Sequence, residues 1–225
     1  MGKRLYIAPV GLVAVALVGA GCGSQGGSAG SGGGQAGGQQ QSQQAPQPVA
    51  QVENLTGKST AVTLDQEFVE GLESLKLTPG PVGNAKISEA GVASFPITGG
   101  NVTYYKPGTT NPYVRGLIEH EGSGLSLKSD ETTVELTDFE VNPANSKLTG
   151  TVTANGEEAA TDAPLFFLNG STLKPLKTKG NTAILDGTTV TLTKEAADLL
   201  NQTFKTDALK KGFPVGVAKI TINTK

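Results

Sequence analysis

Few side chains in this sequence could do chemistry. The 225 residues contain one cysteine, Cys22, one histidine, His120, and no tryptophan. A lone cysteine excludes an intrachain disulfide framework, and with one histidine it cannot complete a structural zinc site. Three of the four tyrosines, Tyr104, Tyr105 and Tyr113, flank one loop rich in proline, glycine and threonine. Amphipathic rings beside a loop form a candidate recognition surface, the alternative being that they pack against a hairpin.

His120 is the candidate that would matter most for catalysis. It lies in a segment, residues 116–122, in which Ile118 and His120 alternate with glutamates. On a strand, Glu119 and Glu121 would face away from His120 and would raise its pKa only through space. The sequence contains no Gly-x-Ser-x-Gly nucleophile motif. A Ser-His-Asp triad assembled from distant residues is the enzymatic alternative, but we expect no enzymatic activity and a solvated or hydrogen-bonded histidine.

The charged residues do not indicate a metal or nucleic-acid site. The acidic pairs at 130–131 and 157–158 fall in expected turns and lack the spacing of a calcium-binding EF-hand loop. Without Lys3 and Arg4, 16 basic side chains are balanced by 20 acidic ones, which gives a net charge of −4. The lysines are scattered and do not alternate with aromatic residues, so we expect no metal and no nucleic-acid partner.

Residues 1–21 have the layout of a secretory signal peptide. Two basic residues, Lys3 and Arg4, precede an apolar stretch of mostly small residues. The uncharged span ends at residue 21 and contains Pro9, which disfavours a transmembrane helix, since such a helix needs about 20 residues.

Cys22 directly follows the small residues Gly19, Ala20 and Gly21. This arrangement resembles a bacterial lipobox, in which the thiol receives a diacylglyceryl group, although the usual motif prefers leucine at the position of Gly19. Two or more acyl chains attach a protein stably to a bilayer. We therefore predict lipidation of Cys22 and anchoring at the extracytoplasmic face of the cell membrane. The alternative is an ordinary secreted protein with a free thiol.

Residues 22–52 predict a flexible tether. Nine glycines lie between positions 23 and 38, and no charged residue occurs between Arg4 and Glu53. Such a stretch cannot offset its backbone entropy by burying apolar area. A coil of this length spans roughly 30 Å on average. Residues 53–225 are then sufficient for a single domain.

Two segments of this domain predict helices. Residues 63–66 form a capping box with Thr63 as the N-cap, followed by an apolar stripe through Phe68 and Leu72. The second helix begins after Thr193 and ends near Phe204. One short helix is thus expected near each end of the domain.

Most of the remaining sequence alternates with a period of two, which is typical of strands. The alternation changes phase at Thr137-Asp138, which indicates a β-bulge. Asp186-Gly187 predicts a tight turn between two strands of a hairpin. The expected fold is mainly β (α+β), an antiparallel sandwich or barrel.

A series of short motifs extends through this domain. They are Phe95-Pro-Ile-Thr-Gly-Gly100, the segment 116–125, Val134-Glu-Leu-Thr-Asp-Phe-Glu-Val141, Leu148-Thr-Gly-Thr-Val152, Ala163-Pro-Leu-Phe-Phe-Leu168, the segment 192–201 and Gly212-Phe-Pro-Val-Gly-Val-Ala218. In this order, over about residues 62–223, they resemble the haem-transport-associated (HtaA-like) domain of actinobacterial envelope proteins. The resemblance implies a β-rich domain that holds haem through a tyrosine and a histidine.

His120 matches the histidine of that family. The family's tyrosine lies in the first helical region, where this chain has Phe68 but no tyrosine or tryptophan, so Tyr104 or Tyr105 would have to replace it. No cofactor is required by the sequence, and haem is the ligand that the resemblance suggests. We expect a membrane-anchored, non-enzymatic binding domain; the alternative is a structural envelope lipoprotein that contacts cell-wall polymer or protein.

Overall fold

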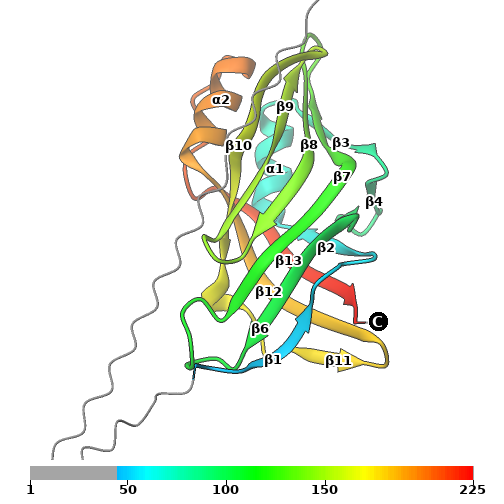
Figure 1. Cartoon of the computed structure of the whole chain (residues 1–225). Coiled ribbons are helices and arrows are strands. Elements are labelled where there is room, and N and C mark those ends of the chain that lie inside the picture. The colour runs from blue at the N-terminus through cyan, green and yellow to red at the C-terminus, as the bar shows by residue number, and fades with distance from the viewer. Residues whose placement is uncertain (1–44, 225) are drawn as a thin grey trace, which may run out of the picture. The chain divides into compact units, whose positions relative to one another are not determined.

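The computed structural model describes residues 45–224, which form one antiparallel sheet of 13 strands and two α-helices (Figure 1). The mainly β class, the antiparallel pairing and the helix near each end of the domain are confirmed. The predicted signal peptide, Cys22 and most of the predicted tether lie outside the described residues. No helix between residues 45 and 224 is long and apolar enough to cross a membrane.

The elements follow one another along the chain with short connections. In order they are β1 (Pro48–Val52), β2 (Lys58–Leu64), α1 (Gln66–Ser74), β3 (Thr78–Gly83), β4 (Lys86–Ile87), β5 (Val92–Pro96), β6 (Gly99–Tyr105), β7 (Val114–Lys128), β8 (Thr133–Asn142), β9 (Lys147–Ala154), β10 (Glu157–Asn169), the 3-10 helix η1 (Gly170–Thr172), β11 (Lys177–Lys179), β12 (Thr182–Leu192), α2 (Lys194–Phe204) and β13 (Pro214–Asn223).

The sheet curls so that β5, near one end of its strand order, lies beside β7, near the other end. Its hydrogen-bonded order is β1-β6-β7-β8-β9-β10-β12-β13-β2-β5-β4, with β3 added to β7 and β11 to β12. Strands β5 and β6 follow each other directly in the chain, yet β5 pairs with β2 and β6 pairs with β7. The chain therefore links the β2 end of the order to the β7 end, and the inward faces of the strands enclose one core.

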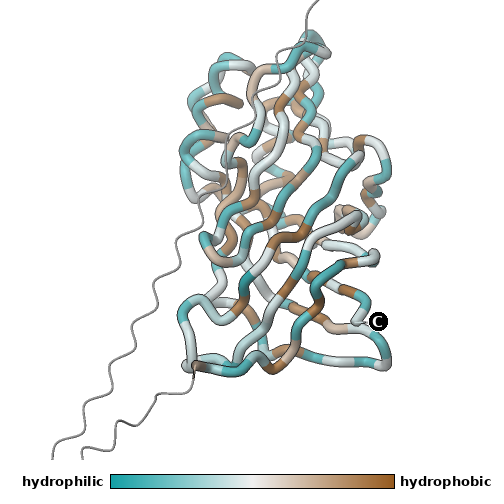
Figure 2. Tube along the Cα trace, in the orientation of Figure 1, coloured by the Kyte–Doolittle hydropathy of each residue, from teal (hydrophilic) through white to brown (hydrophobic). Residues whose placement is uncertain are grey.

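Apolar residues alternate with polar ones along the strands, as Figure 2 shows. On β8 the buried positions change phase between Leu136 and Phe139, where the register against β9 also shifts. Asp138 has a left-handed backbone with φ +53° at this point. The bulge predicted at Thr137-Asp138 is confirmed, and it lets both apolar residues face the core despite their odd spacing.

The helices cover apolar parts of the sheet, and one of the two predicted caps is wrong. Helix α2 is capped as expected by Thr193, whose hydroxyl accepts from a backbone N–H in the first turn. Helix α1 is capped by Asp65, whose carboxylate accepts from the N–H of Glu67 at 2.9 Å. Thr63 cannot serve as the cap because it is the penultimate residue of β2, hydrogen-bonded between β5 and β13.

Two further expectations about boundaries are corrected. The hairpin predicted at Asp186-Gly187 is wrong, because β12 continues through both residues and pairs with β13 on either side of them. Gly187, with φ +99°, instead accommodates a register shift within the strand. The folded domain also begins before residue 53, since β1 lies in the predicted tether and pairs with β6.

Candidate functional site

The structure places His120 inside the domain. It lies on β7 opposite Phe139 of β8, just before the register between these strands shifts. Its side chain is 1% exposed. The ring Nδ1 lies 3.1 Å from the backbone oxygen of Phe139, and Nε2 lies 2.8 Å from the hydroxyl oxygen of Thr60 on β2. Both ring nitrogens are therefore used in hydrogen bonds within the core.

These partners determine the state of the ring. A carbonyl oxygen only accepts, so Nδ1 carries the proton and donates to Phe139, while the Thr60 hydroxyl donates to Nε2. Burial lowers the pKa of His120 from its ordinary value of 6.5 to about 4, and the hydrogen bond to Phe139 opposes this only in part. The imidazole is thus neutral at pH 7. The expected hydrogen bonding is present, but the side chain is not solvated.

Thr60 and His120 have the spacing of a nucleophile and its base, but the surroundings do not suit catalysis. The third partner is a backbone carbonyl rather than a carboxylate, so it cannot stabilise a charged ring as a triad acid does. Thr60 is 5% exposed. Beside the pair is an apolar cavity of about 50 Å³, which is far smaller than the roughly 300 Å³ that the smallest ligand sites provide.

The tyrosines form a second group, at the loop between β6 and β7. The rings of Tyr104 and Tyr113 meet edge to face, with centroids 5.9 Å apart. The Tyr113 hydroxyl donates to the backbone oxygen of Gly170 at 3.1 Å, and the N–H of Leu176 lies 3.4 Å from the Tyr104 hydroxyl oxygen. Partial burial, and then the neighbouring Tyr104, raise the pKa of Tyr113. Both hydroxyls join the loop to the segment that follows β10.

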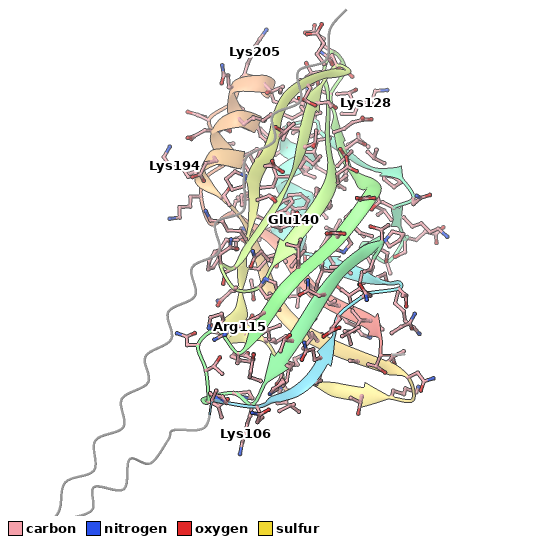
Figure 3. All side chains as sticks on the ribbon, viewed as in Figure 1. Lys106, Arg115, Lys128, Glu140, Lys194 and Lys205 are labelled. Atoms are coloured by element: carbon pink, nitrogen blue, oxygen red, sulfur yellow. The ribbon has the colours of Figure 1, made fainter. Side chains whose placement is uncertain are left out.

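Tyr105 points away from this pair. The guanidinium of Arg115 lies over its ring, 5.2 Å from the centroid. Arg115 also donates to the backbone oxygen of Pro112 and to the hydroxyl of Thr110, at 3.2 and 3.0 Å. Figure 3 places Arg115 and Lys106 at this end of the molecule. Tyr105 and Arg115 therefore contact each other on the outer side of the loop, and the hydrogen bonds of Arg115 stabilise it.

His120 and the tyrosines do not form one ligation site. Tyr104 pairs with Val114, and His120 lies six residues further along the same strand. At about 3.3 Å per residue this separates His120 from the tyrosine level by roughly 20 Å. The structure thus brings Tyr104 and Tyr113 together, and leaves Tyr105 and His120 apart from them.

Two adjoining cavities connect these regions. The inner cavity, of about 50 Å³, lies beside His120 and Thr60 and is lined otherwise by apolar side chains and Thr188. The outer cavity, of about 340 Å³, lies between the loop before Tyr113, the β8–β9 connection and η1. Four residues line both cavities: Val141, Leu168, Thr188 and Ile220. Tyr113 thus lines the outer compartment and His120 the inner compartment of one internal space, with these four side chains between the two compartments.

The lining of this space carries no formal charge at pH 7. Asn111, Asn169 and Ser171 supply uncharged polar groups at the outer cavity, and Phe167, 46% exposed, adds an apolar rim. No sequence motif marks Asn111, Asn169 or Ser171 as a site residue. Their only signal is the turn-forming Asn169-Gly170 pair, which says nothing of what the turn encloses.

The acidic residues do not converge on a metal site in the described part of the chain. Between residues 45 and 224, no three histidine, cysteine or acidic side chains lie close enough together to hold a metal ion.

Comparison with known proteins identifies a similar fold but no similar sequence. No family model matches the chain, and no curated protein matches it. Among solved structures, the C-terminal domain of HtaA from Corynebacterium glutamicum is similar, with a TM-score of 0.53 and 14% sequence identity. The match covers 76% of this chain and 99% of that domain. At this identity the likeness concerns the fold, and residues 45–224 adopt a fold similar to that of the HtaA C-terminal domain.

Proposed function

We propose that this chain is a lipid-anchored, extracytoplasmic protein whose β domain is a non-enzymatic binding module for a small molecule. The observation that carries the proposal is the outer cavity between the loop before Tyr113 and η1. Its volume of about 340 Å³ falls within the roughly 300–1,000 Å³ typical of ligand sites, and such sites are mostly apolar with a few polar groups at fixed positions. The outer cavity has this composition.

Haem is the ligand suggested by the resemblance to HtaA-like domains, and the residues as placed do not fit it. A histidine ligand needs a ring nitrogen free to face the iron, and both nitrogens of His120 are engaged within the core. The cavity beside His120 holds only about 50 Å³. The hydroxyl next to the ring belongs to Thr60, and the tyrosines lie roughly 20 Å along the strand. If haem binds, it binds without His120 as a ligand.

The anchoring part of the proposal rests on Cys22 and the signal that precedes it. Lipidation would hold the domain at the membrane surface, within reach of sparingly soluble small molecules. The mass of the mature N-terminal peptide tests this directly, since a diacylglyceryl group on Cys22 is expected. An unmodified thiol, or a Cys22→Ser variant that remains in the membrane fraction, would overturn it.

Binding is tested with two probes, the neutral fluorophore 1-aminoanthracene and hemin. We expect the fluorophore to bind in the outer cavity and to be excluded by Leu173→Trp, because Leu173 lines this cavity. Leu199→Trp is the matched control, since Leu199 is equally half-buried but lies on α2.

For hemin, we expect no difference between the Soret spectra of the wild-type protein and a His120→Gln variant. If neither probe binds, the chain is better described as a structural envelope lipoprotein that contacts wall polymer or protein.

A further inference from the structure

The shape and charge of the internal space indicate which class of molecule it takes. We propose that the outer cavity binds a single unbranched apolar chain, such as an alkyl or acyl chain, with its uncharged polar end at Asn169 and Ser171. The inference rests on the proposed function and adds the ligand class to it.

The uncharged lining of the two cavities favours a ligand without formal charge. Among residues 45–224, no lysine, arginine, aspartate or glutamate lines either cavity, and the titratable groups that do, His120 and Tyr113, are neutral at pH 7. A charged group placed inside would lose its hydration without gaining an ion partner, which costs several kcal/mol. Amides, hydroxyls and backbone groups supply the polar atoms that line the outer cavity, and these suit an alcohol, ester or amide end.

The taper of the space favours a ligand that narrows toward His120, such as a chain, over one of uniform width. The volume falls from about 340 Å³ in the outer cavity to about 50 Å³ in the inner one. Val141 and Thr188 stand in the wall between them. A ligand that fills the outer cavity and points toward His120 must therefore narrow along its length, as the end of an alkyl chain does.

The volume sets the length of the chain. A methylene needs about the room of a water molecule, roughly 30 Å³ in the liquid, so the outer cavity accommodates a chain of about ten carbons. Burial of each methylene tightens binding by about fourfold, until the chain reaches the wall. Affinity should thus rise steeply with length and then level off.

Displacement of bound 1-aminoanthracene by 1-alkanols of six to fourteen carbons tests this inference. For the wild-type protein we expect Kd to fall about fourfold per methylene and to level off near ten carbons. Val141→Ala should move this break to longer alkanols by opening the wall to the inner cavity. Val134→Ala is the matched control: it lies on the same strand, is equally buried and lines neither cavity, so its break should stay in place.

The outcomes separate the two proposals. The proposal of an alkyl or acyl ligand is overturned if Kd shows no break with alkanol length. It is also overturned if Val141→Ala leaves the break unchanged while the variant still unfolds cooperatively. In either case the cavity remains a binding site. The proposed function is overturned if the fluorophore does not bind, or if it binds Leu173→Trp equally well. The proposal of an alkyl or acyl ligand then fails with it.

Discussion

Protonation of His120 should destabilise the domain in a defined pH window. The folded protein holds the ring with a pKa of about 4, whereas the unfolded chain binds a proton near pH 6.5. The stability that the neutral, buried ring contributes is therefore fully present above pH 6.5. It is lost as the pH falls toward 4, because the unfolded state binds the proton first. Linkage gives a loss of about 2 kcal/mol at pH 5 and about 3 kcal/mol at pH 4.

A non-titrating substitute isolates this effect from the carboxylates, which also titrate at low pH. His120→Gln can donate to the oxygen of Phe139 and accept from the hydroxyl of Thr60, so it preserves both contacts without a proton equilibrium. Urea unfolding followed by far-ultraviolet circular dichroism, from pH 7.5 to 4.5, gives the two stability curves. We expect the wild-type curve to fall more steeply by about 1.2 kcal/mol per pH unit between pH 6 and 5.

Parallel curves for the two proteins would refute this reasoning, because they would mean that the histidine titrates alike in both states. A buried, fully hydrogen-bonded ring could then not be its environment in the folded protein. In the described part of the chain, no other titratable side chain lines the inner cavity, and carboxylates outside it titrate in both proteins, so the difference between the curves reports on His120.

Three predictions about packing are tested by urea unfolding at pH 7.5. Gly116→Ala should cost at least about 3 kcal/mol, because Gly116 has φ +123° and a Cβ there would lie 2.1 Å from the backbone oxygen of Asn101. Gly170→Ala, with no atom within 4 Å of the added carbon, should change the free energy of unfolding by no more than about 0.5 kcal/mol. Equal losses of stability in the two glycine variants would contradict the strand geometry at Gly116. Thr193→Ala should cost about 1–2 kcal/mol through loss of the α2 cap, whereas Thr193→Ser should recover most of it. Tyr113→Phe should cost about 1 kcal/mol through loss of the bond to Gly170, and no change would place that hydroxyl in solvent.

The sequence was sufficient where the deciding interactions are local. Alternation of apolar residues indicated strands, and the phase change at Thr137-Asp138 located a bulge, since the period of two is a property of the strand itself. Thr193 was identifiable as a cap because its partner lies three residues away. The lipobox-like segment before Cys22 is also a local pattern, and lipidation of this residue stays a prediction.

Errors arose where a local signal met a partner from elsewhere in the chain. Asp186-Gly187 is a good turn sequence, but pairing of β12 with β13 on both sides keeps the strand continuous. Thr63 is a good capping residue, but its backbone is hydrogen-bonded within the sheet, so Asp65 takes the role. Long-range hydrogen bonds outweighed local preference in both cases.

The site depended most on tertiary structure. The sequence determined that the chain has a single histidine on a strand, a tyrosine-flanked loop and a lipobox-like segment before Cys22. Only the tertiary structure decided that His120 faces inward onto Thr60, that Tyr105 separates from Tyr104 and Tyr113, and that an uncharged cavity lies behind them. The physical reason is that a period of two shows that a strand has two faces, whereas the curl of the whole sheet decides which face is enclosed.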